Sequence, residues 1–126
     1  MDGFAADVVS LMQAKVPEGR RATVTKIVDK MLFNFRNVGF IHLLFPNAKI
    51  IHTVRGFSDT LLSNFKYKFE DSGLEWSFSV AETVAYFAAY RRLMRHWEAV
   101  LPGRVTPVLR PPALNPSICC LSCFQY

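Results

Sequence analysis

The sequence has no long apolar run, although half of its residues are apolar. Hydrophobic residues make up 51% of the 126 residues. Polar or charged side chains interrupt each stretch before the roughly 18 apolar residues that a membrane-spanning helix needs. The start, Met1-Asp2-Gly3-Phe4, has neither the basic region nor the apolar stretch of a secretory signal. These absences predict no transmembrane segment and slightly favour a cytoplasmic location.

Cysteine is scarce and confined to one end of the chain. The three cysteines are Cys119, Cys120 and Cys123, all within the last eight residues. An odd number of closely spaced cysteines does not build a disulfide framework, and a structural zinc ion needs four ligands. We therefore predict incidental thiols and no metal site, with lipidation and metal binding as the open alternatives.

The motifs that mark common catalytic and nucleotide-binding loops are also missing. The six glycines form no Gly-x-Gly-x-x-Gly, Gly-x-Ser-x-Gly or Gly-Lys-Ser/Thr sequence. The three histidines, His42, His52 and His96, are not at the spacing of metal ligands. We expect all three to be structural, and His52, close to the end of a predicted strand, is the strongest candidate for another role.

Acidic residues are fewer than basic ones. The chain carries 15 Lys and Arg against 10 Asp and Glu, a net charge of +5, which suits an anionic ligand or simply a soluble surface. Lys66 and Lys68 alternate with Tyr67 and Phe69, a pattern that can bind nucleic acid. A solvated helix end produces the same pattern more often, so we expect no nucleic-acid partner.

The hydrophobic pattern that is present predicts an α/β chain. The consecutive residues Ile50 and Ile51 are typical of a strand covered on both faces. A strand, a helix and a second strand within about thirty residues form a parallel βαβ unit. The expected helices span 4–14, 34–44, 58–69 and 80–101, and the expected strands span 23–28 and 48–54.

Capping signals and prolines predict where the elements begin and end. Ser58 is the predicted N-cap of its helix, with Asp59 in the first turn. Ser79 and Glu82 have the spacing of a capping box, and 70–78 is expected to be a loop. Val105 can start a strand, but four prolines between 107 and 116 predict an irregular tail over 106–126.

Two cations and a hydroxyl mark a candidate anion site. Arg55 follows the strand 48–54, and Ser63 lies about two turns into the next helix. Lys30 ends the first strand on the edge where Arg55 ends the second, if the strands are parallel. Ligands of α/β sheets bind outside the carboxyl ends of strands, where helix N-termini favour anions. The pattern predicts a phosphate clamp.

The order of motifs resembles a known family. The segments concerned are Asp29-Lys30, Asn34-Phe35, 40–52, Arg55, Asp59-Thr60, Ser63-Asn64-Phe65, 90–97 and 101–104. They resemble sulfotransferases that use 3′-phosphoadenosine-5′-phosphosulfate (PAPS), especially those with tetratricopeptide repeats and more distantly the tyrosylprotein sulfotransferases. The resemblance implies a partial P-loop-NTPase-like sulfotransferase fold, a short parallel sheet flanked by helices. It divides the chain into an N-terminal helix and connection (1–21), a partial sulfotransferase domain (22–105) and a tail (106–126).

The resemblance also implies roles for single residues. Arg55 and Ser63 match the family positions that bind the 3′-phosphate of PAPS or of its product, adenosine 3′,5′-bisphosphate (PAP). Lys30 matches the family's catalytic lysine near the sulfuryl group, where a cation stabilises charge on the bridging oxygen. The intact family transfers a sulfuryl group from PAPS to a hydroxyl or amine, and the acceptor here is unidentified.

Departures from the family pattern set the expectation for this chain alone. Gly56-Phe57 replaces the usual acidic turn after Arg55, and Met31 stands where a proline is common. No segment matches the glycine-rich loop for the 5′-phosphosulfate, and no general base is identified. We expect nucleotide binding without activity, or alternatively a degenerate, non-catalytic interaction module that self-associates through an exposed sheet edge. A preceding Golgi anchor stays open.

Overall fold

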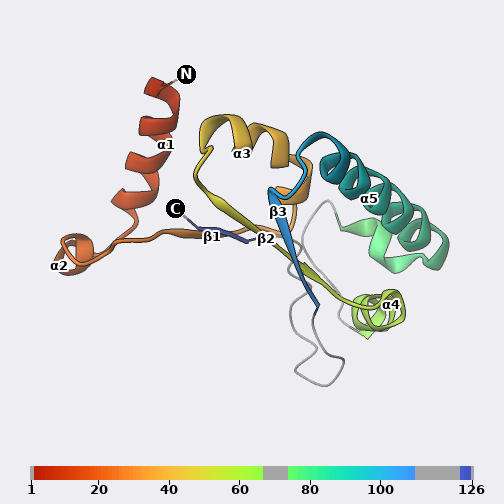
Figure 1. Ribbon diagram of the computed structural model, residues 1–126. Coiled ribbons are helices and arrows are strands. Elements are labelled where there is room, and N and C mark those ends of the chain that lie inside the picture. The colour runs from red at the N-terminus through yellow and green to blue at the C-terminus, as the bar shows by residue number, and fades with distance from the viewer. Residues whose placement is uncertain (1, 67–73, 110–122, 126) are drawn as a thin grey trace.

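The computed structural model describes residues 2–66, 74–109 and 123–125 (Figure 1). Cys119, Cys120 and the Lys68 end of the basic-aromatic pattern lie outside these residues. The elements in chain order are α1 (Asp2–Ala14), α2 (Glu18–Arg21), β1 (Val28–Lys30), the 3-10 helix η1 (Asn34–Arg36), α3 (Val38–Leu44), β2 (Lys49–Val54), α4 (Phe57–Lys66), the 3-10 helix η2 (Glu75–Phe78), α5 (Val80–Val100), β3 (Val105–Leu109) and β4 (Cys123–Gln125).

The sheet confirms the α/β class and adds a strand that the sequence did not predict. Its order is β1-β4-β2-β3, with β2 and β3 parallel. Strand β4 is antiparallel to both β1 and β2, so β1 and β2 point the same way without pairing. The sheet is therefore mixed rather than wholly parallel. The expected βαβ direction is present, and the carboxyl ends of β1 and β2 share one edge.

Two predicted elements have different bounds. The strand expected over 23–28 lies instead at Val28–Lys30, because β4 offers only three partner residues to it. A β-branched run favours a strand only where a partner is available. The helix expected over 34–44 is divided into η1 and α3 at Asn37, whose φ of −109° and ψ of 11° are not helical.

The tail predicted to be irregular contains two strands. Strand β3 begins at Val105 as expected but continues through Pro107 to Leu109. Pro107 is tolerated because β3 is an edge strand, where a missing backbone N–H removes no necessary bond. Strand β4, which includes Cys123, also lies in this tail. The segment expected as a loop over 70–78 contains η2 in its described part.

Of the two predicted N-cap residues, one is confirmed and the other is wrong. Ser79 caps α5, since its Oγ accepts a hydrogen bond from the Glu82 backbone N–H at 3.4 Å. Ser58 is not the N-cap of α4, because the helix begins at Phe57 and the Thr60 N–H donates to the Gly56 carbonyl at 3.0 Å. Asp59 lies in the first turn, as predicted.

The core joins α3, α5 and the sheet. Its buried apolar residues are Phe35, Val38, Ile41, Ala48, Ile50 and Tyr90. The Trp97 indole N–H donates to the Phe35 carbonyl at 2.7 Å. A Cβ at Gly39 would lie 2.9 Å from the Trp97 ring, so a glycine lets α3 and α5 approach closely.

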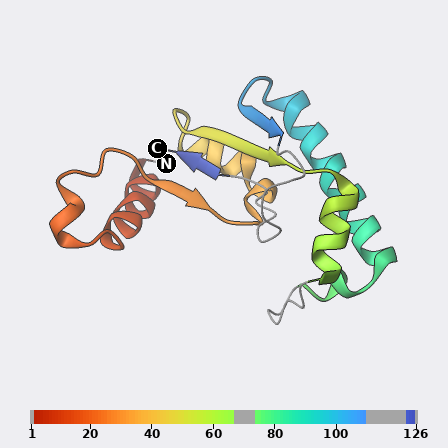
Figure 2. The same ribbon diagram turned by 90° about the horizontal axis from the view of Figure 1, so that it is seen from below.

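The molecule is elongated, with α1 and α2 at one end and α4 and α5 at the other (Figures 1 and 2). Phe4 of α1 contacts Phe40 of α3, with 6.3 Å between ring centroids. None of the helices in the described part of the chain is long and apolar enough to cross a membrane.

Candidate functional site

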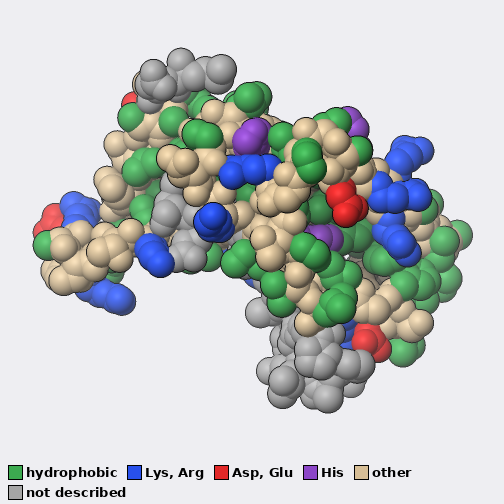
Figure 3. All heavy atoms as spheres, viewed as in Figure 1, with side chains coloured by type: hydrophobic (Ala, Val, Ile, Leu, Met, Phe, Trp, Pro, Cys, Tyr) green, Lys and Arg blue, Asp and Glu red, His purple; other side chains and the backbone are tan. Residues whose placement is uncertain are grey.

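A pocket of about 770 Å³ lies between α5 and the carboxyl half of β2. Four cationic residues line it, namely Lys30, Arg55, Arg91 and Arg95, and one carboxylate, Glu98. Figure 3 shows basic side chains gathered on the side of the molecule where α5 lies. Much of the remaining wall is apolar or aromatic. The pocket therefore combines positively charged side chains with apolar surface.

Arg55 is the most constrained of the cations. It follows β2 directly, and its side chain is only 15% exposed. The Nε atom lies 3.9 Å from Asp59 Oδ2 on the first turn of α4, a loose ion pair. The Nη1 atom is buried without a hydrogen-bond partner among the described residues. A buried donor without a partner lowers stability by about 1–3 kcal/mol, and by more when it is charged. A ligand that accepts a hydrogen bond from it would remove this cost.

Lys30 lines the same pocket from the end of β1. It is exposed, and the Asp29 carboxylate beside it instead accepts a hydrogen bond from the Asn34 amide at 3.0 Å. The structure thus brings together two of the three residues that the sequence singled out. Their convergence follows from the common direction of β1 and β2.

Ser63 is not brought to the pocket. The residues of α4 that line it are Phe57, Thr60 and Asn64. Positions 60 and 64 lie one above the other on a helix, whereas Ser63 lies about 100° around from Asn64. Thr60 and the buried Asn64 occupy the α4 face toward the pocket, and the assignment of Ser63 to the 3′-phosphate stays a prediction. Helical spacing counted from Phe57 could have revealed this face.

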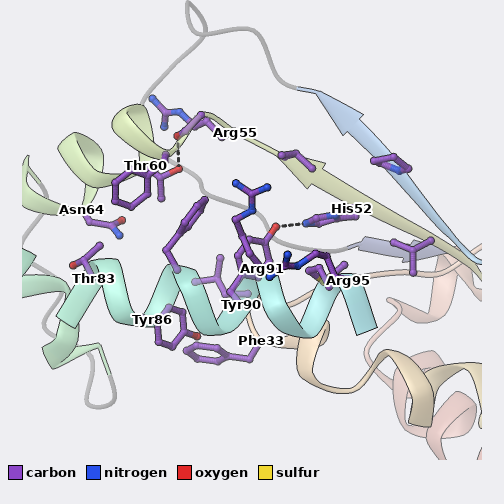
Figure 4. Close-up of a pocket in the computed structure, with 18 of the residues that line it drawn as sticks. Phe33, His52, Arg55, Thr60, Asn64, Thr83, Tyr86, Tyr90, Arg91 and Arg95 are labelled. Atoms are coloured by element: carbon purple, nitrogen blue, oxygen red, sulfur yellow. Dashed lines mark hydrogen bonds between the residues drawn. The ribbon is translucent and has the colours of Figure 1, made fainter. Parts of the chain in front are cut away.

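His52 lines the pocket but is held by Tyr90. Its Nε2 atom shares a hydrogen bond with the Tyr90 hydroxyl, and both residues are buried (Figure 4). Burial lowers the pKa of His52 below its ordinary value, so the ring is neutral near pH 7. The expectation of a structural histidine is confirmed for His42, whose Nδ1 accepts a hydrogen bond from Arg104 Nε at 3.1 Å.

The far end of the pocket is aromatic and was not foreseen. Trp76 of η2 stacks on Tyr86 of α5, with ring centroids 3.9 Å apart and an interplanar angle of 5°. Phe57 and Phe87 meet nearby, with centroids 4.7 Å apart. Because 70–78 was predicted to be a loop, the packing of Trp76 was not predicted. Its aromatic character and the Tyr86-Phe87 pair were signals of that packing.

Metal chemistry has no support in the described ranges. No group of three His, Cys, Asp or Glu side chains there could hold a metal ion. The guanidinium and ammonium groups that line the pocket are donors suited to an anion.

The fold and site define an α/β protein with a cation-lined pocket at the carboxyl ends of its strands. The sequence model of the sulfotransferase family matches residues 3–109, which includes all four cations. The chain belongs to the sulfotransferase family. This match is wider than the range 22–105 expected for the domain, whose bounds stay a prediction.

One relative shows sequence similarity over most of this chain. An uncharacterized protein of Aquifex aeolicus (strain VF5) is 35% identical over 82 residues. The aligned part is 64% of this chain but only 11% of the relative's length. No solved structure gives a significant match.

Proposed function

We propose that this chain is the 3′-phosphate-binding part of a PAPS-dependent sulfotransferase. The observation that supports this best is the buried, unpartnered Nη1 of Arg55 in a pocket that Lys30 also lines. A phosphate oxygen would satisfy that nitrogen and form a charge-assisted hydrogen bond. Family membership makes the 3′-phosphate of PAPS or PAP the natural source of the anion.

Arg55 and Lys30 have different tasks in this proposal. Arg55, held by its burial and by Asp59, fixes the 3′-phosphate and thereby orients the nucleotide. Lys30, exposed at the end of β1, stabilises charge that develops on the bridging oxygen as the sulfuryl group leaves. Thr60 and Asn64 stand where the family's serine hydroxyl was expected, while the role of Ser63 stays a prediction.

Sulfuryl transfer by the whole protein is also a proposal. The chain spans 11% of the length of its relative from Aquifex aeolicus. Neither a glycine-rich loop for the 5′-phosphosulfate nor a general base has been found in the sequence. Catalysis of this kind depends on positioning and charge stabilisation, so we expect the chain to bind nucleotide and to transfer no sulfuryl group by itself.

Calorimetry with two nucleotides tests the proposed phosphate site. We expect PAP to bind more tightly than adenosine 5′-monophosphate, which lacks the 3′-phosphate. Arg55→Ala should weaken PAP binding by at least about tenfold, because a charge-assisted hydrogen bond contributes roughly 1.5–3 kcal/mol.

Arg92→Ala is the matched control, since Arg92 is exposed on α5 and does not line the pocket. Equal affinity for the two nucleotides, or equal loss in Arg55→Ala and Arg92→Ala, would remove the assignment of Arg55.

One observation favours a second candidate, a non-catalytic interaction module. Among the described residues, β1 and β3 form the two edges of the sheet, and the pairing of β2 with β4 covers only Lys49–Ile51. Unpaired strand edges promote association with other chains. Concentration-dependent oligomers in light scattering, together with no response to PAP, would favour this candidate.

A further inference from the structure

Two arginines on the pocket face of α5 are not needed for the proposed 3′-phosphate site. Arg91 and Arg95 are four residues apart and both line the pocket. Figure 4 shows them projecting from α5 into the space between α5 and β2. Two like charges at this spacing repel each other on a helix, so an anion bound between them would be favourable.

No residue in the described part of the chain supplies such an anion. The ion pairs among the described residues are Arg21–Glu18 and Arg55–Asp59. Glu98 lines the pocket one turn beyond Arg95. Neither arginine side chain forms a hydrogen bond or an ion pair with Glu98 or any other described residue. The two guanidinium groups are exposed and available to a ligand.

Much of the wall of the pocket that these arginines line is apolar. The apolar part is formed by the side chains of Phe57, Phe87, Tyr90, Met94, Leu101 and Val105. A ligand of this pocket must therefore bury an apolar body while presenting an acidic group at the rim. A purely polar anion would leave the apolar wall exposed to water, whereas an apolar body would remove that surface from water.

We propose that the pocket binds an amphiphilic anion, whose acidic group lies between Arg91 and Arg95 and whose apolar body fills the space toward β2 and β3. This reading deepens the proposed function and rests on it: the acceptor of the sulfuryl group is an apolar molecule that carries a carboxylate, sulfate or sulfonate besides its hydroxyl or amine. Lys30 and Arg55 remain for the nucleotide, and electrostatic complementarity selects the acceptor.

A pair of fluorescent probes tests this inference without any need for activity. Anilinonaphthalene sulfonate has an apolar body with one sulfonate, and phenylnaphthylamine has the same rings without the charge. We expect the wild-type protein to bind the sulfonate at least about tenfold more tightly, since one good charged contact is worth roughly 1.4 kcal/mol or more. The double variant Arg91→Gln/Arg95→Gln should lose this preference and bind both probes alike.

Arg92→Gln again provides the control, because it removes an adjacent charge that does not line the pocket. Thermal unfolding monitors that every variant is folded. The proposal is overturned if Arg92→Gln reduces sulfonate binding as much as the double variant, or if the wild-type protein does not distinguish the probes.

Competition separates the acceptor from the nucleotide as the source of the anion. With PAP at saturation, retained sulfonate binding supports an acceptor site, whereas full displacement means that Arg91 and Arg95 serve the nucleotide and overturns the acceptor assignment. The proposed function is judged separately, by the dependence of PAP affinity on Arg55. If Arg55→Ala does not change PAP affinity but the wild-type protein still prefers the sulfonate probe, the pocket binds an anion and the proposed nucleotide site is wrong.

Discussion

His52 illustrates how a single buried side chain couples the site to pH. It is 8% exposed and shares a hydrogen bond with Tyr90. Burial lowers its pKa in the folded state, whereas the unfolded value is about 6.5. The unfolded chain therefore binds a proton more readily, and the contribution of neutral His52 to stability is full above about pH 6.5. It is lost as the pH falls toward the lowered folded pKa.

Urea unfolding between about pH 7.5 and about pH 5.5 measures this contribution. We expect the wild-type protein to lose stability on acidification, with His52 responsible for at most about 1.4 kcal/mol per pH unit. His52→Gln keeps a neutral hydrogen-bonding group, so its stability should fall less steeply. The same slope in both proteins would show that His52 is not the titrating group.

The candidate site was predictable where backbone direction alone decides it. Lys30 ends β1 and Arg55 follows β2. Because the two strands point the same way, both residues line one pocket. Ser63 required the rotation of α4, which depends on how Phe57 packs against Phe87. Arg91 and Arg95 were missed because a basic residue on a helix gives no sign, from its sequence alone, of whether it faces a pocket.

At the scale of elements, α5 is the best-specified part of the chain. A run of aromatic and apolar residues at helical spacing predicted it, Ser79 begins it, and Gly103, with a φ of 72°, follows its end. Local signals sufficed because both ends are determined within a few residues. Strands β1 and β4 depend on each other across about ninety residues of chain, and no local pattern contains that pairing.

The two serines that looked like N-caps provide a matched comparison. Ser79→Ala removes an oxygen that accepts from the Glu82 N–H, and we expect it to lower the free energy of unfolding by about 0.5–1 kcal/mol. Ser58→Ala should change it by only a few tenths, because Ser58 lies inside the first turn of α4. Urea midpoints at constant slope measure both. A loss in Ser58→Ala equal to that in Ser79→Ala would contradict this assignment of the caps.

The sheet includes a strand from outside the family match. Residues 3–109 match the family, yet β4, which joins β1 to β2, lies at Cys123–Gln125. Without β4, the family-matched elements leave a space one strand wide between β1 and β2. Lys30 and Arg55 line the pocket from the carboxyl ends of these two strands. Any strand from a neighbouring segment or molecule must compete with β4 for this position.

Removal of residues 110–126 tests this competition directly. Because β4 is the pairing partner of Val28–Lys30 and Lys49–Ile51, we expect their amides to lose protection from hydrogen exchange. The parallel pair of β2 with β3 should keep its protection at Thr53 and Val54. The exposed edges should also make the shortened protein associate in a concentration-dependent way, as unpaired strands do.

Phe124→Pro in the full chain separates the loss of pairing from the loss of the tail. Proline removes a backbone donor from the middle of β4, so the amides of Val28–Lys30 should exchange faster while the length of the chain is unchanged. Unaltered protection of β1 in both proteins would show that β4 does not support the sheet. Faster exchange in both, together with association of the shortened protein, would mean that β4 covers the facing edges of β1 and β2.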